Sequence, residues 1–312
     1  MALDKLEVMR AFCRIVETGN FKNASEDLNI ATTTLSGQIQ SLENHLGIKL
    51  LHRTTRRVSP TADGLQYYQR ILPLLDEIEE INQEIQQQDN LSGLLKVEMP
   101  SPVADHLIVP NLPSFLQKYP NLRLEIGSSE RVVDLVNEGV DCAIRGGVIT
   151  DESLVAKVIG QMPFCLCTTP DYLSHHTPIT TAEDLEQHCY LAFKFAATGK
   201  LAKVYVDQSV REHVKDGILF HKTPDQTYNN AQTYYRALLA GLGVGYAPKA
   251  VVEPYLASGE LVEILKDYPL QAMPMSFVYP YSRYTPKRVK IFQEWVEDLV
   301  KQNPIWQKVL EI

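Results

Sequence analysis

Residues 31–57 read ATTTLSGQIQSLENHLGIKLLHRTTRR, and this stretch decides the fold of the first part of the chain. Apolar residues at helical spacing run from Leu35 to Leu46, and Gly47 is a typical helix end. The opposite face carries short hydroxyl and amide side chains, those of Thr32, Thr33, Thr34, Ser36, Gln38 and Gln40. Exposed helix faces usually carry Lys and Glu, whereas hydroxyls and amides suit base edges and phosphates. The stretch therefore predicts a helix that reads DNA.

The segment after this helix concentrates positive charge in an acidic protein. The whole chain has a formal net charge of −8, yet residues 50–57 contain Arg53, Arg56, Arg57 and no acid. Such a run in isolation is typical of a solvated loop. Its place directly after the polar helix favours instead a wing whose arginines lie along a phosphate backbone or a minor groove.

Two shorter helices are predicted before the polar helix. Apolar residues at helical spacing run from Leu6 to Val16 and end at Gly19-Asn20, and a short helix follows from about Phe21. Together with the polar helix and the basic hairpin they predict a winged helix-turn-helix domain over residues 1–60, with the helix-turn-helix at about 21–40. For the helices alone, an all-α packing module is the alternative.

The run DKLEVMRAFCRIVETGNFKNASEDLNIATTTLSGQIQSLENHLGIKLLHRTTRRVSPTADG resembles the N-terminal domain of the LysR-type transcriptional regulators. It matches in F…V…G-N-F…A…L, in L-S…I..LE..LG.KLL.R and in the closing T..G. From the polar face and this resemblance we expect DNA contacts at Thr32, Thr33, Thr34, Ser36, Gln38, Arg53, Thr54, Arg56 and Arg57. Gly37 departs from the pattern, because the family often has a basic residue there; glycine costs roughly 1 kcal/mol of helix propensity.

A longer helix is predicted over residues 61–89. Its apolar residues Ile71, Leu74, Ile78, Ile81 and Ile85 follow a heptad spacing, which favours a two-helix homodimer contact. The family resemblance also implies this pairing. An amphipathic helix packed on its own domain is the alternative. Pro73 lies inside the pattern and is expected to bend the helix or mark a change of partner. A dimer would place two recognition helices on a pseudo-palindromic site in double-stranded DNA.

The remaining residues, 90–312, alternate predicted strands and helices after a hinge at DNLSG (89–93). Strands are predicted in LLKVEMP, RLEIGSS, DCAIRGG, LVAKVI, PFCLCTT, ELVEIL and MSFVYP. Helices are predicted from near Val103 to LQKYP, in RVVDLVNEGV and in VKIFQEWVEDLVKQ, and NNAQTYYRALLAGLGVGYAP predicts a helix, a glycine turn and a strand. This alternation indicates an α/β fold whose ligand lies at the C-terminal ends of the strands.

This half resembles the effector domain of the same family, a two-lobed α/β fold like the type 2 periplasmic solute-binding proteins. The resemblance lies in L.P.L..F...YP...L, D.AIR.G and AGLGVGYAP. It implies lobe one at about 94–164 and 267–303 and lobe two at about 165–266. Ser101 begins a predicted helix, where free amides favour an anion, although a plain N-cap is the alternative. We expect effector contacts at Ser101, Pro102, Ser128 or Ser129, Arg145, Thr168 and Asn229; Arg145 has a structural ion pair as its alternative.

Other classes of protein are disfavoured by the sequence. It shows no signal peptide and no apolar run long enough to span a membrane. Cys165 and Cys167 lie in a strand pattern that suits buried thiols in a reducing compartment, so we expect a cytoplasmic protein. GLGVG follows a helix and precedes a strand, the reverse of a dinucleotide motif. The pair His175-His176 has no second ligand pair, and no catalytic signature is present, so no enzyme activity, metal or cofactor is expected.

These patterns predict a DNA-binding transcriptional regulator that senses a small molecule, expected to be a polar organic metabolite. Its expected mechanism is a ligand-dependent equilibrium between two arrangements of a homotetramer, and an activator would also contact RNA polymerase. The tetramer is implied by the resemblance only. The alternative is a cytosolic small-molecule-binding α/β module or enzyme with a helical dimerisation domain, which needs neither the Thr/Gln face nor the arginine wing. A nucleoid-type architectural protein would need far more positive charge.

Overall fold

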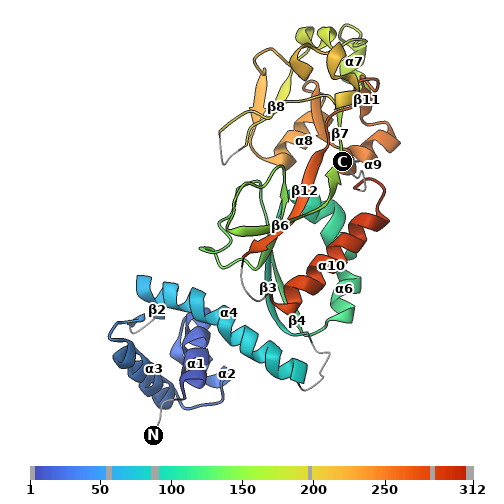
Figure 1. Cartoon of the computed structure of the whole chain (residues 1–312). Coiled ribbons are helices and arrows are strands. Elements are labelled where there is room, and N and C mark those ends of the chain that lie inside the picture. The colour runs from blue at the N-terminus through green and yellow to red at the C-terminus, as the bar shows by residue number, and fades with distance from the viewer. Residues whose placement is uncertain (1–3, 54–57, 86–90, 196–198, 282–284, 307–312) are drawn as a thin grey trace. The chain divides into compact units, whose positions relative to one another are not determined.

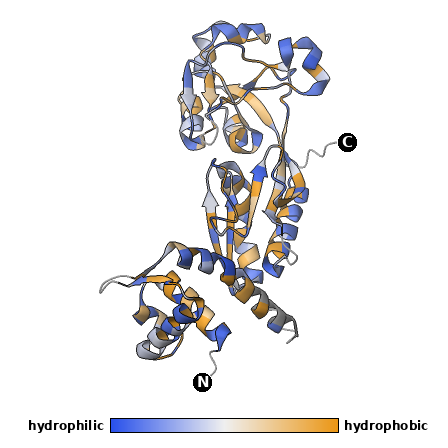
Figure 2. Cartoon of the chain, turned by 60° about the vertical axis from the view of Figure 1, so that its left-hand side comes forward, coloured by the Kyte–Doolittle hydropathy of each residue, from blue (hydrophilic) through white to orange (hydrophobic). Residues whose placement is uncertain are grey.

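The computed structural model describes residues 4–53, 58–85, 91–195, 199–281 and 285–306 of the 312-residue chain. The chain forms two compact units, Met1–Gly93 and Leu94–Ile312. Figure 1 shows a small, mainly helical N-terminal unit and a larger C-terminal unit built around β-sheets. Figure 2 shows hydrophilic and hydrophobic residues side by side in the helices of each unit, as expected for amphipathic helices.

The N-terminal unit contains the three helices and the strand pair that the sequence predicts. Its elements are α1 (Lys5–Thr18), α2 (Phe21–Asp27), α3 (Thr32–Leu46), β1 (Leu51–Arg53), β2 (Val58–Pro60) and α4 (Ala62–Ile85). The Asp4 carboxylate begins α1 by accepting the amides of Leu6 and Glu7. Gly19 and Gly47 end α1 and α3 with φ angles of 70° and 72°, a conformation that glycine adopts without strain. Strands β1 and β2 pair antiparallel, with His52 opposite Ser59.

The core of this unit explains why its helices form. Phe12 and Ile15 of α1 pack with Leu35 and Ile39 of α3, and all four side chains are fully buried. Helix α4 closes the same core through Ile71 and Leu75. The first half of α4 therefore packs on its own domain, as in the alternative interpretation of its apolar stripe.

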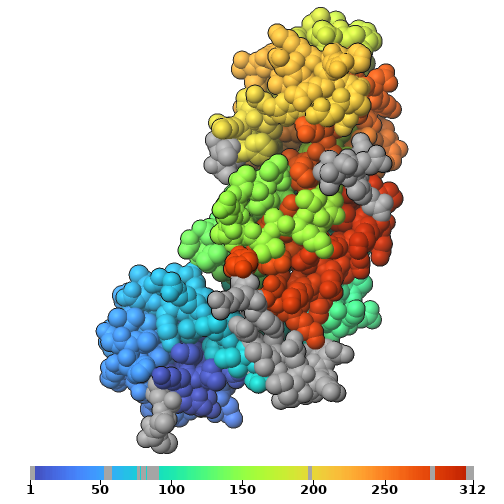
Figure 3. All heavy atoms as spheres, in the orientation of Figure 1, coloured from blue at the N-terminus to red at the C-terminus, as the bar shows by residue number. Residues whose placement is uncertain are grey.

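The first lobe of the C-terminal unit is a five-stranded sheet in the order β4-β3-β5-β12-β6. The strands are β3 (Gly93–Met99), β4 (Leu122–Ser128), β5 (Cys142–Gly146), β6 (Leu154–Met162) and β12 (Met273–Pro280). The helical segments are α5 (Ser101–Val103), the π-helical η1 (Ala104–Ile108), the 3-10 helix η2 (Val109–Asn111), α6 (Leu112–Lys118) and α10 (Lys287–Gln302). Helices α6 and α10 lie side by side, because Phe115 packs edge-on against Phe292 at 5.6 Å (Figure 1). Figure 3 shows the atoms of α10, in red, exposed along one side of this unit.

The second lobe begins where β6 passes through Pro163 into β7. Its strands are β7 (Phe164–Thr168), β8 (Leu191–Phe193), β9 (Gln226–Tyr228), β10 (Gly245–Pro248) and β11 (Val262–Ile264). Its helical segments are α7 (Pro170–Ser174), η3 (Glu183–Gln187), η4 (Gln208–His213), η5 (Lys215–Gly217), α8 (Ala231–Leu239) and α9 (Lys249–Ser258). Strand β7 lies between β10 and β11, antiparallel to both. Cys165 and Cys167 are buried in β7, as predicted.

The C-terminal unit differs from the prediction in several places, of which the run 131–140 and helix α9 are two; strands β8 and β9 were not predicted, and the helix predicted from near Val103 is divided into α5, η1, η2 and α6. The run RVVDLVNEGV (131–140) is not a helix, and within it residues 135–139 form a turn. The Asp134 carboxylate accepts the backbone and side-chain amides of Asn137, and Gly139 ends the turn at a φ of 64°. These local bonds compete with helix growth, as short polar side chains often do. Helix α9, which includes Pro254, was not predicted at all.

Candidate DNA-binding face and effector cavity

Helix α3 presents the polar face expected of a recognition helix. Thr32, Thr33 and Thr34 are exposed at its first turn, while Ser36 and Gln38 are half-buried. Thr32 also has a structural role, because its hydroxyl lies 2.8 Å from the hydroxyl of Ser25 in α2. Farther along the same helix the exposed residues are again polar and none is acidic: Gln40, Ser41, Asn44 and His45. The face can therefore approach polyanionic DNA without a carboxylate in its path.

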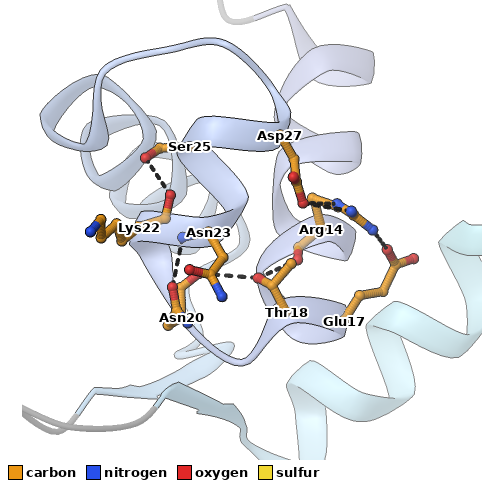
Figure 4. Close-up of polar contacts among 8 residues, drawn as sticks. All are labelled: Arg14, Glu17, Thr18, Asn20, Lys22, Asn23, Ser25 and Asp27. Carbon is orange, nitrogen blue, oxygen red and sulfur yellow. Dashed lines mark hydrogen bonds and ion pairs between the residues drawn. The ribbon is translucent and has the colours of Figure 1, made fainter.

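A polar cluster fixes α2 against α1, and the sequence patterns did not predict it (Figure 4). Arg14 donates from Nε to Asp27 over 2.8 Å and from Nη1 to Glu17 over 2.8 Å. The Asn20 side chain begins α2 by accepting the amide of Asn23 over 2.7 Å. The hydrogen bonds of Arg14, with that to Glu17 first, raise the pKa of its guanidinium. Arg14 therefore holds the two helices together rather than reaching outward.

The wing is anchored by a buried carboxylate that the sequence patterns also did not predict. Glu43 of α3 is 2% exposed and accepts the amides of Leu50 at 3.0 Å and Leu51 at 3.3 Å, and the ammonium of Lys49 at 2.7 Å. Burial alone would raise the pKa of Glu43, but these donors outweigh it and lower the pKa. The sequence contains one signal for this contact: Glu43 directly follows Leu42, on the apolar side of the helix, where an acid needs hydrogen-bond donors.

The predicted wing contacts lie at the limit of the described structure. Arg53 ends β1, and its side chain lies outside the described atoms. Thr54, Arg56 and Arg57 lie outside the described residues. The antiparallel pairing of β1 with β2 brings the chain back alongside itself, as expected for a wing.

Helix α4 carries exposed apolar side chains besides those in the core. Leu74 is 56% exposed and Leu65 46% exposed, whereas Ile71 is 6% exposed. Ile71 therefore belongs to the domain core and not to the dimer seam predicted for it, while Ile78 is half-buried. The side chains of Ile81 and Ile85 lie outside the described atoms.

The C-terminal unit contains a cavity of about 620 Å³ lined by both of its lobes. The first lobe contributes charged side chains, those of Glu98, Glu130, Arg131, Arg145 and Asp151. The second lobe contributes aromatic side chains, those of Phe164, Phe193, Phe195, Tyr234, Tyr235 and Tyr246. This volume lies within the range of small-molecule sites, and the lining is mainly apolar with a few polar groups.

Of the predicted effector residues, Pro102 and Arg145 line this cavity. Ser129, named as the alternative to Ser128, also lines it, whereas Ser128 is exposed at the end of β4 and does not. Thr168 was wrongly expected here: it is fully buried, and its hydroxyl donates to the Gly243 carbonyl over 2.8 Å. Asn229 is exposed and does not line the cavity. The residue that caps the N-terminus of α8 is Asn230, not Asn229.

Ser101 does not offer the anion site that its position suggested. It does not line the cavity, and its hydroxyl donates to the Glu130 carboxylate over 2.9 Å. The hydroxyl of Ser101 therefore already donates to an anionic group of the protein itself. No side-chain cap forms at this end of α5, which is only one turn long.

The two arginines of the cavity are already engaged. Arg131 donates to both oxygens of Glu138, with Nη1 2.9 Å from Oε1. Arg145 donates from Nη2 to the carbonyl of Val133. A further hydrogen bond crosses between the lobes, from the Gln232 amide to the Asp105 carboxylate over 3.1 Å.

The helices of the described residues include none that is long and apolar enough to cross a membrane. Nor do any three His, Cys, Asp or Glu side chains of this part of the chain gather into a set that could hold a metal ion.

Comparison with known proteins identifies the family. Residues 6–65 match the family described as "Bacterial regulatory helix-turn-helix protein, lysR family", and residues 88–301 match the "LysR substrate binding domain". The uncharacterized HTH-type transcriptional regulator YhjC of Escherichia coli (strain K12) is 32% identical over 302 residues, covering 96% of this chain and 99% of that protein. An HTH-type transcriptional repressor of Pseudomonas aeruginosa (strain UCBPP-PA14) is 31% identical over 307 residues, covering 97% and 94%.

A solved structure has the same two-part architecture. CrgA, a LysR-type transcriptional regulator from Neisseria meningitidis, aligns with a TM-score of 0.58 and 29% identity, covering 94% of this chain and 97% of CrgA. The two family matches fall on the helical N-terminal unit and on the cavity-bearing C-terminal unit respectively. The chain therefore belongs to the LysR family of bacterial transcriptional regulators, with a helix-turn-helix DNA-binding domain and an effector-binding domain.

Proposed function

We propose that this regulator binds a pseudo-palindromic promoter site through the exposed face of α3 and the arginines of the wing. Thr33 and Thr34 would contact base edges in the major groove, and Arg53, Thr54, Arg56 and Arg57 would contact the backbone beside it. The observation that carries this proposal is the acid-free polar face of α3, exposed from Thr32 to His45. The single acid of this helix, Glu43, is buried and accepts hydrogen bonds from the amides of Leu50 and Leu51 at the base of the wing.

Two copies of the chain would pair through α4. The exposed side chain of Leu74, which belongs to the predicted heptad stripe, supports this pairing, because an exposed apolar side chain in such a stripe is typical of an association surface. A dimer would present two copies of α3 to the two half-sites, and pairs of dimers would form a homotetramer. An effector in the cavity would shift the balance between tetramer arrangements that bend DNA differently, and an activator would also contact RNA polymerase.

The first test measures DNA binding by fluorescence anisotropy on the promoter region beside the protein's own gene, with random duplex as the competitor. The Arg53→Ala, Arg56→Ala protein is expected to bind the promoter more weakly. Its slope of log affinity against log salt should be smaller by about two, one for each phosphate that an arginine no longer neutralises. Dimerisation, measured by light scattering, should not change.

The matched control removes two arginines from the other unit. Arg123 and Arg236 are exposed residues of the C-terminal unit, so the Arg123→Ala, Arg236→Ala protein loses the same charge from the unit that does not contain α3 and the wing. It should keep the affinity and the salt slope of the unaltered protein. Equal weakening in both proteins would mean that only net charge matters. No preference for the promoter over random duplex would overturn the proposed function.

A further inference from the structure

We infer that the effector of the C-terminal cavity is a cation: a small molecule with a protonated amine on an apolar, ring-sized body. This inference rests on the proposed role of the cavity as the effector site and adds the chemical class of the ligand. It replaces the expectation that Ser101 marks an anion site. Three features of the lining carry it: the state of the arginines, the state of the carboxylates and the aromatic wall.

An anionic ligand would find one of the two arginines of the cavity already paired with a carboxylate, and further carboxylates beside both arginines. Arg131 is held by both oxygens of Glu138, and Arg145 donates to the carbonyl of Val133. An anion would have to displace Glu138 from Arg131, and beside Arg145 it would still lie close to the carboxylates that line the cavity, those of Glu98, Glu130 and Asp151. Like charges at close range in a partly desolvated site are unfavourable.

Glu98 supplies the clearest unmatched charge. It is half-buried on β3, and within the described part of the chain its side chain forms no hydrogen bond or ion pair. Burial, against the weaker attraction of Arg131, raises the pKa of this carboxyl. Its carboxylate lies against the backbone of Gly127, where an added Cβ would come within 1.8 Å of Glu98 Oε1. Buried charges in proteins are usually paired, so a cationic ligand would supply the partner that the chain lacks.

The aromatic wall of the second lobe suits the rest of such a ligand. Phe193 and Phe195 meet edge to face at 5.6 Å, and both line the cavity. Tyr235 also lines it, and its hydroxyl carries no hydrogen bond among the described residues. Burial, with the charge of Glu130 second, raises the pKa of the Tyr235 phenol, so it remains neutral. Aromatic faces attract cations and pack against rings, and a neutral phenol accepts a hydrogen bond from an ammonium group.

The test compares three probes that share one ring and one two-carbon arm but differ in charge. Isothermal titration calorimetry at neutral pH measures the binding of phenethylamine, hydrocinnamate and phenethyl alcohol to the full-length protein. Phenethylamine should bind at least about tenfold more tightly than either other probe, as expected for one charge-assisted hydrogen bond. Glu98→Gln and Glu130→Gln should each weaken phenethylamine about tenfold while leaving phenethyl alcohol unchanged.

Glu294→Gln is the control, because Glu294 is an exposed acid on α10 away from the cavity lining. It should bind all three probes like the unaltered protein. Tighter binding of hydrocinnamate, equal binding of phenethyl alcohol and phenethylamine, or no binding of phenethylamine would each overturn the inference. The promoter titration on the same preparation separates the two proposals. If the protein binds its promoter but does not prefer the amine, only the inferred class of ligand is wrong. If it binds the amine but not the promoter, only the proposed function is wrong.

Discussion

Gly37 lies in the middle of the exposed face of α3, and its environment leaves room for a side chain. Apart from the neighbouring backbone of α3 itself, no atom of the described residues lies within 4 Å of the position that a Cβ would occupy. Gly37→Ala should therefore raise the free energy of unfolding of the N-terminal unit by about 1 kcal/mol, because alanine loses less backbone entropy in a helix. Chemical denaturation followed by circular dichroism measures this change.

Gly64 is the matched contrast within the same unit. A Cβ at Gly64 would lie 1.9 Å from the carbonyl oxygen of Leu50, where the base of the wing meets α4. Gly64→Ala should destabilise the unit severely, since backbone atoms would have to move. If Gly37→Ala and Gly64→Ala changed the free energy of unfolding in the same direction, helix propensity at Gly37 and steric fit at Gly64 would not explain the changes.

The buried carboxylate of Glu43 makes the stability of the wing depend on pH. The pKa of Glu43 is lowered in the folded protein from an ordinary value of 4.5. Its contribution to stability is therefore fully present above about pH 4.5 and is lost as the pH falls through the lower folded pKa. Glu43→Gln should cost about 2 kcal/mol of unfolding free energy at neutral pH, because charge-assisted hydrogen bonds become neutral ones.

The measurement is a series of denaturation curves for both proteins between neutral and acidic pH. The difference between them should shrink as the pH falls from about 4.5 to the lower folded pKa of Glu43, and it should stay constant below that. A difference that stays constant through the acidic range would show that the loss comes from packing and not from charge. Glu294→Gln, on an exposed acid of the C-terminal unit, provides the control for removing a carboxylate.

At the scale of one element, α4 has two apolar surfaces with different roles. Ile71 is buried in the domain core, whereas Leu74 is 56% exposed. Ile71→Ala should cost about 3 kcal/mol of unfolding free energy, as large-to-small changes in a core do. Leu74→Ala should leave the unfolding of the monomer nearly unchanged and weaken dimerisation about tenfold.

Analytical ultracentrifugation over a concentration series measures the dimer constant. The control is Leu242→Ala, which truncates a leucine that is 45% exposed in the C-terminal unit. An unchanged dimer constant in Leu74→Ala would show that the proposed pairing does not use this side of α4.

The elements of the N-terminal unit could be predicted because local signals agree there. Helical spacing and a terminal glycine give the same bounds for α1 and α3, and Asp4 adds a capping residue to α1. The run 131–140 has helical spacing too, but its side chains form a local turn that periodicity cannot reveal. In α4, spacing identified the apolar residues but not which partner each one contacts.

The cavity was harder to predict than the fold because its lining comes from distant parts of the chain. Pro102, Ser129 and Arg145 lie at or after the ends of first-lobe strands, a position that the α/β pattern identifies. The aromatic wall comes from the second lobe, from elements such as β8 and α8. The engagement of Ser101 by Glu130 joins residues 29 positions apart, and only the folded chain shows it.

At the scale of the whole molecule, the described core clusters keep to one unit each. The cluster around Phe12 draws its residues from the N-terminal unit, and the clusters around Tyr190 and Tyr234 draw theirs from the C-terminal unit. Since stability comes mainly from such cores, we expect two unfolding transitions in calorimetry. Promoter DNA should raise the midpoint of one and a cavity ligand that of the other.

Two matched truncations test this independence. Phe12 in α1 and Phe292 in α10 are both fully buried, so each alanine variant loses the same side chain from a different core. Phe12→Ala should lower the midpoint of the transition that DNA stabilises by about 10 °C, and Phe292→Ala should lower only the other. A single transition, or a joint shift of both in either variant, would show that the units unfold together. In that case effector binding in the cavity could stabilise the N-terminal unit directly, because the two units would unfold as one. If the transitions are independent, the effector must instead change DNA binding by changing the arrangement of the subunits.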